Sequence, residues 1–217
     1  MSLETINLIK DENIAVIKLN RPDLLNAVNE QLVWDLQDAT ESVKDDSTIK
    51  VVIITGEGRG FCAGADLSER KASWKGSKDA LIRGYKPFFE NIVNMPKPVI
   101  GSISGPAAGI GAAIAMSCDL RIMSEDSYIL SVFSNIALVP DGGLSWYLPK
   151  YMGYSKAYEY AIEAKKITAE ECLKYGIANK VVSSDKLESK TLEWAKKLAK
   201  RSSQSLEHTK KLMRESL

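Results

Sequence analysis

The chain has 217 residues, of which 45% are hydrophobic and 26% charged, the ordinary balance of a globular protein with a sizeable core. Its formal net charge of +1, with no basic stripe interleaved with aromatic side chains, gives no reason to expect a nucleic-acid partner. Apolar runs such as residues 110–116 are far shorter than the roughly 20 residues that a transmembrane helix needs, so we expect no membrane partner.

The N-terminus and the cysteines indicate a cellular compartment. The first ten residues lack the charged-then-apolar layout of a secretory signal. Cys62, Cys118 and Cys172 are an odd, widely spaced set, which suits a reduced compartment better than a disulfide framework. The sequence therefore predicts a cytoplasmic protein.

The first third of the chain predicts strands around one helix. Clustered β-branched residues at 5–10 and 13–19 are typical of a hairpin. Asn29 is suited to cap a helix, because its side chain can accept a hydrogen bond from the first turn. The apolar stripe of that helix comprises Leu32, Val33, Leu36, Ala39 and Val43. A continuous apolar run at 49–55 then predicts a buried strand, followed by a glycine-rich loop at 56–64.

The middle of the chain continues this alternation. A helix is expected near 79–94, because Pro96 and Pro98 follow it. A strand at 98–104 then enters a helix through a turn of small residues. Residues 119–124 and 127–130 predict a further pair of strands.

The last third is mainly helical from Leu144 onward. A capping box at Thr168 to Glu171 predicts a helix start, and residues 179–182 predict a short strand. Two amphipathic, lysine-rich helices at 184–201 and 203–217 close the chain.

No linker or low-complexity tract divides these elements. We therefore predict an α/β fold: a core of repeated strand-strand-helix units at 1–183 and a helical C-terminal extension at 184–217.

The small-residue turn at 105–119 is the first candidate site. Its glycines leave room for close backbone approach, and the free N–H groups of a helix start can bind developing negative charge. A dinucleotide fingerprint is disfavoured, because Ile114 stands where that motif needs a small residue. Tight helix packing stays an equal alternative. No side chain before Cys118 can readily exchange a proton here, so any acid or base must come from elsewhere.

A second turn, Ala63 to Asp66, has the same small-residue character. Two such turns can each direct one N–H at a single oxygen and so form an oxyanion hole. Two unrelated turns, with Asp66 capping the next helix, are the simpler alternative from the sequence.

Asp141 is the candidate acid or base. It has apolar residues on one side and a Gly-Gly turn on the other, and desolvation there would raise its pKa. The alternative is that it caps the helix beginning near Leu144. His208 is the only histidine and lies in a lysine-rich terminal helix, which disfavours a histidine-based triad and a multi-histidine metal site, so we expect no metal.

Five segments, in order, resemble the enoyl-CoA hydratase/isomerase (crotonase) family over most of the chain. They are Asn20 to Ala27, Gly60 to Asp66, Lys97 to Asp119, Pro140 to Gly143 and Thr168 to Val182. The resemblance implies a spiral of strand-strand-helix turns, assembled as a homotrimer or hexamer. It also implies an acyl-CoA thioester substrate, with coenzyme A part of that substrate and no separate cofactor. Family members usually continue beyond the position of Leu217, so we expect the C-terminal extension to be incomplete relative to them.

The resemblance also assigns residues. The two N–H donors to the thioester oxygen match Ala65 and Ile110, and Gly109 belongs to the second donor turn. The coenzyme A arm is expected along Leu25, Ala27, Ala63 and Gly64, with Arg70 or Lys71 as phosphate contacts. The acyl pocket is expected among four aromatic residues, for which core packing is an equal alternative: Trp74, Tyr85, Phe88 and Phe133.

The chain departs from the family's hydratases at the two glutamates that activate water. Their positions are occupied by Ala113 and Phe133, neither of which can transfer a proton. Residues 133–142 are similar to the isomerase branch, in which one acid at the position of Asp141 moves a proton between carbons. We therefore expect an acyl-CoA double-bond isomerase, of the 3-enoyl to 2-enoyl or the ring-epoxide type. A hydratase and a non-catalytic CoA-thioester-binding protein are the alternatives.

Overall fold

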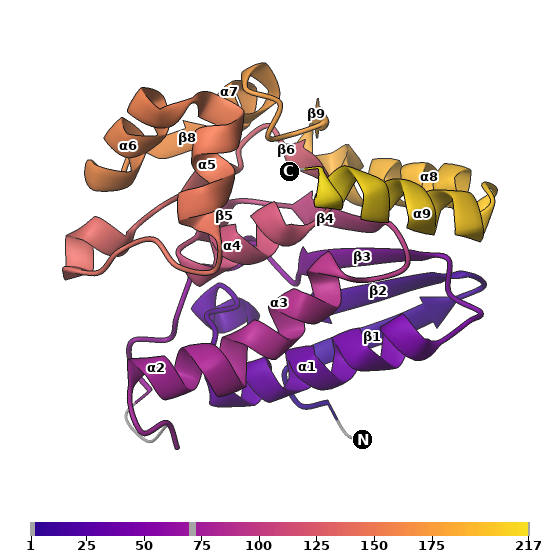
Figure 1. Cartoon of the computed structure of the whole chain (residues 1–217), viewed down its shortest axis with the longest axis horizontal. Coiled ribbons are helices and arrows are strands. Elements are labelled where there is room, and N and C mark those ends of the chain that lie inside the picture. The colour runs from indigo at the N-terminus through magenta and orange to yellow at the C-terminus, as the bar shows by residue number, and fades with distance from the viewer. Residues whose placement is uncertain (1–2, 70–72, 217) are drawn as a thin grey trace.

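The computed structural model describes residues 3–69 and 73–216 and contains a large sheet covered by helices (Figure 1). The strand order of this sheet is β1-β2-β3-β4-β6-β9. Its strands are β1 (Ile6–Asp11), β2 (Ile14–Leu19), β3 (Val51–Gly56), β4 (Val99–Ile103), β6 (Leu120–Ser124) and β9 (Lys180–Val182). The predicted hairpin is confirmed, since β1 pairs antiparallel with β2, and the remaining pairs are parallel.

A second, small sheet corrects one prediction. It has the order β5-β7-β8 and consists of β5 (Pro106–Ala108), β7 (Tyr128–Leu130) and β8 (Lys166–Thr168). The strands expected at 119–124 and 127–130 therefore do not pair with each other. Both edges of β6 are already occupied by β4 and β9, so β7 pairs with β5 instead.

Three of the described helices, those beginning at Glu30, Ala169 and Ser203, have a capping side chain at their N-terminus. Asn29 accepts a hydrogen bond from Leu32 N at 3.0 Å, and Thr168 and Glu171 form the predicted capping box. The α-helices are α1 (Glu30–Asp45), α2 (Ser77–Asp79), α3 (Lys86–Val93), α4 (Ile110–Ser117), α5 (Leu144–Met152), α6 (Tyr154–Ile162), α7 (Ala169–Lys174), α8 (Leu187–Ala199) and α9 (Ser203–Glu215). A π-helical segment, η2 (Ala80–Tyr85), leads into α3, and single 3₁₀ turns form η1 (Pro22–Leu24), η3 (Phe133–Ile136) and η4 (Ser184–Lys186).

The large sheet is covered on both faces. Along β3, Val52 and Ile54 pack into a cluster with α1, α3 and α4, whereas Val51 and Ile53 pack with α8. Successive side chains of a strand point to opposite faces, so a strand buried on both sides reads as a continuous apolar run. Within residues 3–69 and 73–216, no helix is both long and apolar enough to cross a membrane.

Candidate active site

The two small-residue turns lie side by side. Cys62 N donates to Pro106 O at 3.0 Å, and Ala108 N donates to Cys62 O at 2.9 Å. These two hydrogen bonds form a short parallel bridge between Cys62 and Ala107. The turns that follow are also in contact, since a Cβ added to Gly109 would lie 3.7 Å from Gly64 Cα. The residues that follow these two glycines are Ala65 and Ile110. The structure thus brings the two turns together at one place.

Each turn presents an N–H group. Val28 N donates to Gly64 O, and Asp66 N donates to Val28 O, so the Ala65 N–H points away from Val28. Ile110 is the first residue of α4, and its N-cap Gly109 offers no side chain. Among the residues that the structure describes, the N–H groups of Ala65 and Ile110 have no hydrogen-bond acceptor. Both are available to a ligand.

A glycine is required immediately before each of the two residues that present an N–H group. Gly64 has φ +109° and Gly109 has φ +52°, conformations that side-chain-bearing residues rarely adopt. These angles let the backbone turn so that the next N–H faces outward. The sequence signal of two small-residue turns therefore has a definite conformational cause.

Leu25 and Ala27 lie beside the first turn. Ala63 N donates to Leu25 O at 2.9 Å, and Asn26 is fully buried, donating to Gly60 O at 2.8 Å. The structure therefore brings Leu25 and Ala27 next to Ala63 and Gly64, as a shared binding loop requires. The predicted phosphate contacts Arg70 and Lys71 lie outside the described residues.

Among the residues that the structure describes, the first helix after Asp66 begins at Ser77, and Asp66 does not cap it. Its carboxylate accepts hydrogen bonds from Ser68 and pairs with Arg21 at 2.9 Å. The Ser68 and Arg21 hydrogen bonds hold the pKa of Asp66 below its usual range. Asp66 fixes the loop and is held as an anion.

Asp141 is in the opposite situation. It does not cap α5, because the N-cap is Gly143. Its Oδ1 atom is buried and has no hydrogen-bond partner among the described residues. Burial raises the pKa of this carboxyl, against a smaller lowering by its own backbone N–H. A carboxyl that loses water without gaining a partner is suited to exchange a proton.

The turn that carries Asp141 packs on the helix that carries Ile110. A Cβ added to Gly142 would lie 2.5 Å from Ala113 Cβ and 3.2 Å from Ile110 Cδ1. The carboxyl of Asp141, whose pKa is raised, and the free N–H of Ile110 therefore lie on adjoining segments.

Other reactive groups are poor candidates. Cys62, Cys118 and Cys172 are buried and unpaired, and burial raises the pKa of each thiol to about 12. His208 is exposed on α9. Within the described part of the chain, no three metal-ligating side chains come together.

The sequence model described as Enoyl-CoA hydratase/isomerase matches residues 10–217. The chain belongs to this family. It is 33% identical over 193 residues to the 1,2-epoxyphenylacetyl-CoA isomerase of Escherichia coli, covering 87% of this chain and 74% of that protein. It is 34% identical over 177 residues to a probable enoyl-CoA hydratase of Rhodobacter capsulatus, covering 82% and 68% of the two chains.

Solved structures agree in fold with this member of the enoyl-CoA hydratase/isomerase family. An enoyl-CoA hydratase from Mycobacterium avium superposes with a TM-score of 0.91 at 28% identity, covering 100% of this chain and 87% of that chain. One from Bacillus anthracis gives a TM-score of 0.91 at 29% identity, covering 97% and 83%. The predicted crotonase-like α/β fold is therefore confirmed.

This family member has a pocket of about 450 Å³ next to the Asp141 turn. Gly142 and Gly143 form part of its wall, and Trp146 and Tyr147 of α5 form another. The remaining apolar wall is one face of the segment η2–α3: Leu81, Tyr85, Phe89 and Val93. Burial, and then the charge of Asp141, raises the pKa of Tyr85 to about 12.

Sequence reasoning missed Phe89, Trp146 and Tyr147 as pocket residues. For Phe89 a signal was present, because Leu81, Tyr85, Phe89 and Val93 recur every four residues and so share one helical face. Trp146 and Tyr147 had no such signal, since their place depends on how α5 and α3 each pack against α4.

Three of the four predicted aromatic residues serve packing. Phe88 is 0% exposed and Phe133 is 5% exposed, and both belong to the apolar core. Trp74 packs against Trp34, with ring centroids 5.2 Å apart. The Phe133 side chain is almost fully enclosed by the core, and the substrate contact expected of it stays a prediction. Tyr85 does line the pocket.

Proposed function

We propose that the protein is an acyl-CoA double-bond isomerase in which Asp141 carries the proton. The observation that carries this proposal is the buried, unpartnered Oδ1 of Asp141 on a turn packed against Ile110 and Ala113. The wider activity, acyl-CoA chemistry of the enoyl-CoA hydratase/isomerase type, is supported by the family and by the names of the relatives.

The thioester oxygen binds between the N–H groups of Ala65 and Ile110. Asp141 takes a proton from the carbon next to the thioester carbonyl of a 3-enoyl-CoA, and the electron pair moves onto the oxygen. The two N–H groups stabilise this dienolate, and losing one such donor costs about 3 kcal/mol of transition-state stabilisation. Asp141 then returns the proton to the far carbon of the conjugated system, which gives the 2-enoyl-CoA. No water and no net proton are consumed.

The raised pKa of Asp141 suits both halves of this transfer. A base with a very low pKa would remove the proton poorly, whereas efficiency is greatest when the pKa lies near the working pH. Burial raises the pKa of the Asp141 carboxyl, which brings it nearer to the working pH.

The residues at the two hydratase glutamate positions favour isomerisation over hydration. Ala113 is 0% exposed and is covered by Gly142, and Phe133 is packed in the core. Neither can position or activate a water molecule. Hydration is the second candidate function, because several relatives are named as hydratases, among them the crotonyl-CoA hydratase of Syntrophomonas wolfei at 34% identity.

Coenzyme A enters as part of the substrate, so we propose that no separate cofactor is needed. Its arm binds along Leu25, Ala27, Ala63 and Gly64, whose segments are joined by backbone hydrogen bonds. This loop leads directly to the Ala65 N–H.

The decisive experiment supplies 3-enoyl-CoA and follows the formation of 2-enoyl-CoA. We expect turnover by the wild type and a loss of about 10²–10⁴-fold in kcat for Asp141→Asn, the usual size of a general acid–base contribution. Asp185→Asn is the matched control, since that aspartate is exposed and distant in sequence from the site.

Three other results would overturn parts of the proposal. Equal turnover by Asp141→Asn would remove Asp141 as the base. Hydration of crotonyl-CoA faster than isomerisation would favour the hydratase. Binding of CoA thioesters without turnover of either substrate would favour the non-catalytic alternative.

A further inference from the structure

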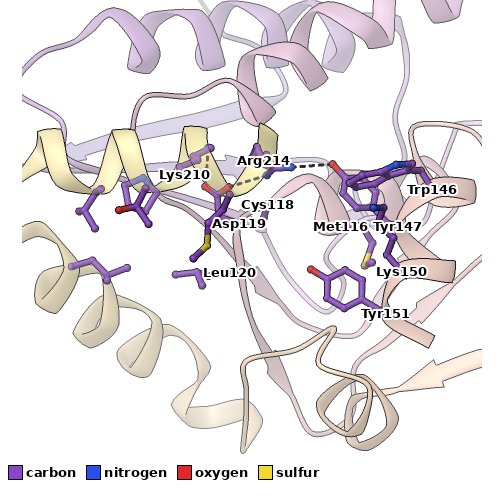
Figure 2. Close-up of a pocket in the computed structure, with 15 residues that line it drawn as sticks. Met116, Cys118, Asp119, Leu120, Trp146, Tyr147, Lys150, Tyr151, Lys210 and Arg214 are labelled. Carbon is purple, nitrogen blue, oxygen red and sulfur yellow. Dashed lines mark hydrogen bonds and ion pairs between the residues drawn. The ribbon is translucent and has the colours of Figure 1, made fainter. Parts of the chain in front are cut away.

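Three cavities of the described residues share the aromatic pair Trp146 and Tyr147, and one of them, between α9 and residues 93–96, has charged walls that include Glu207, Lys211 and Glu215. The pocket beside Asp141 is lined on one side by Trp146 and Tyr147. A second cavity of about 480 Å³ lies between α4, α5 and α9, and Trp146 and Tyr147 line it as well (Figure 2). Both volumes are in the range of small-molecule sites.

Tyr147 is held in place from three directions. Its ring lies against the turn of Asp141, because a Cβ added to Gly143 would be 3.0 Å from Tyr147 Cε2. Trp146 packs edge-on against it, with ring centroids 4.9 Å apart. Arg214 of α9 donates to the Tyr147 hydroxyl at 3.4 Å, the dashed contact in Figure 2.

Arg214 is itself anchored. Its Nη2 atom donates to Asp119 Oδ1 at 2.8 Å and to Ser117 O at 2.9 Å. Lys210, one helical turn earlier, pairs with Asp119 at 2.8 Å and donates to Ile92 O at 3.1 Å. This cluster holds α9 over the end of α4, so the tyrosine is fixed against a rigid support.

The second cavity offers an apolar environment. Met116, Leu120, Leu206 and Met213 line it beyond Tyr147. Thioether side chains adapt readily to flexible apolar ligands, and each methylene buried strengthens binding about fourfold. An alkyl chain is the occupant that these walls fit.

We infer that Tyr147 ends the acyl pocket and sets the length of acyl chain that the enzyme accepts, with the cavity beneath α9 lying beyond that limit. This rests on the proposed function, because it takes the pocket beside Asp141 as the acyl site. A short acyl group fits between Gly142 and the Tyr147 ring. A longer chain meets the ring and cannot enter the cavity behind it.

Tyr147→Ala tests this inference by joining the two cavities. We expect kcat/KM for a dodecenoyl-CoA to rise at least about tenfold relative to a hexenoyl-CoA, since methylenes then become buried in the second cavity. Tyr147→Phe keeps the ring and is expected to keep the wild-type limit. Leu212→Ala is the control on α9, because Leu212 is 67% exposed and points to solvent.

Binding of saturated acyl-CoA esters, measured by calorimetry, separates this inference from the proposed function. If affinity rises up to a longer acyl chain in Tyr147→Ala than in wild type, the inference is supported even if no isomerase turnover is found. Identical length profiles in wild type and Tyr147→Ala would overturn it, as would a wild-type affinity that keeps rising from hexanoyl-CoA to dodecanoyl-CoA. Should Tyr147→Ala fold poorly, Tyr147→Leu opens the same wall with less loss of packing and is judged by the same outcomes.

Discussion

A single carboxyl, Asp141, is distinguished from the other acids of the chain by what it lacks. Asp66 accepts hydrogen bonds from Ser68 and Arg21, and its pKa is lowered. Asp141 has a buried oxygen without a partner, and its pKa is raised. An unsatisfied buried polar group destabilises a fold, and such groups are retained where chemistry needs them. The difference between the two aspartates is one of environment alone.

The raised pKa of Asp141 predicts a pH dependence. As a base it must be ionised, so kcat should fall as the pH drops through its pKa, at a midpoint above the ordinary aspartate value of about 3.9. The pH profile of isomerisation measures this midpoint. A profile that stays flat down to pH 4 would contradict it.

The raised pKa of Asp141 also predicts how stability depends on pH: ionisation, which catalysis requires, is unfavourable for the fold. Because the folded state raises the pKa of Asp141, its ionised form destabilises the fold above that pKa, and the penalty disappears as the pH falls through it. Asp141→Asn should therefore melt at a higher temperature than wild type at pH 7, with a smaller difference at pH 4. Thermal melts at both pH values test this, and an equal or lower Tm of the variant at pH 7 would count against it.

The Ile110 N–H can be removed without removing the helix. Ile110 is the first residue of α4, a position where proline is tolerated because its N–H has no helical partner. Ile110→Pro should lower kcat by about 10²–10³-fold while the protein stays folded. Ile110→Ala keeps the N–H but loses the side chain, so a similar loss in both variants would show that the side chain is what matters.

Pairs of elements, rather than single ones, create the site. The pairing of Cys62 with Ala107 sets one donor turn beside the other, and the Gly142 turn packs on α4. α9 has no buried residue of its own and is held mainly by Lys210 and Arg214 at Asp119. The position of this helix therefore depends on one carboxylate.

Asp119→Ala should weaken the docking of α9. It leaves Lys210 and Arg214 without their anion and the Val99 N–H without its acceptor. We expect the free energy of unfolding to fall by about 2 kcal/mol, less than for a fully buried pair because these side chains are partly exposed. Urea unfolding measures it. Lys211→Ala, which breaks only an exposed pair with Glu215, should change it by less than about 0.5 kcal/mol.

At the scale of the molecule, an apolar surface remains exposed near the site. It comprises Leu138, Val139, Tyr154, Tyr158 and Ile162, which line one groove. Val139 is 77% exposed and lies two residues before Asp141. Exposed apolar patches of this kind commonly mark interfaces. We propose that copies of this chain meet here in the homotrimer or hexamer that the family resemblance implies.

Sedimentation of the purified protein tests this assembly. We expect a trimer or hexamer for wild type and a shift towards monomer for Val139→Asp, because a buried charge opposes association. Leu173→Asp introduces the same charge at an exposed leucine of α7 and should leave the assembly intact. A monomeric wild type would contradict the proposal. The cytoplasmic location expected from the cysteines stays a prediction.

Much of this fold follows from local sequence patterns. The apolar run of β3, the Asn29 cap and the capping box of Thr168 each act over a few neighbouring residues, and each is found where expected. The two small-residue turns were recognisable for the same reason, since glycine at positive φ is a local requirement. Together with the order of the family segments, these patterns predicted the fold and the candidate donors Ala65 and Ile110.

The tertiary structure decided what depends on distant neighbours. Strand pairing sent β7 to a different sheet from β6, because both edges of β6 were taken. The residues around Asp141 favoured a helix cap, and the family resemblance alone pointed to an acid, until packing left its oxygen buried and unpartnered. The contact of Arg214 with Tyr147 joins residues 67 positions apart. Burial, edge occupancy and long-range contacts are properties of the assembled chain, so no local pattern could reveal them.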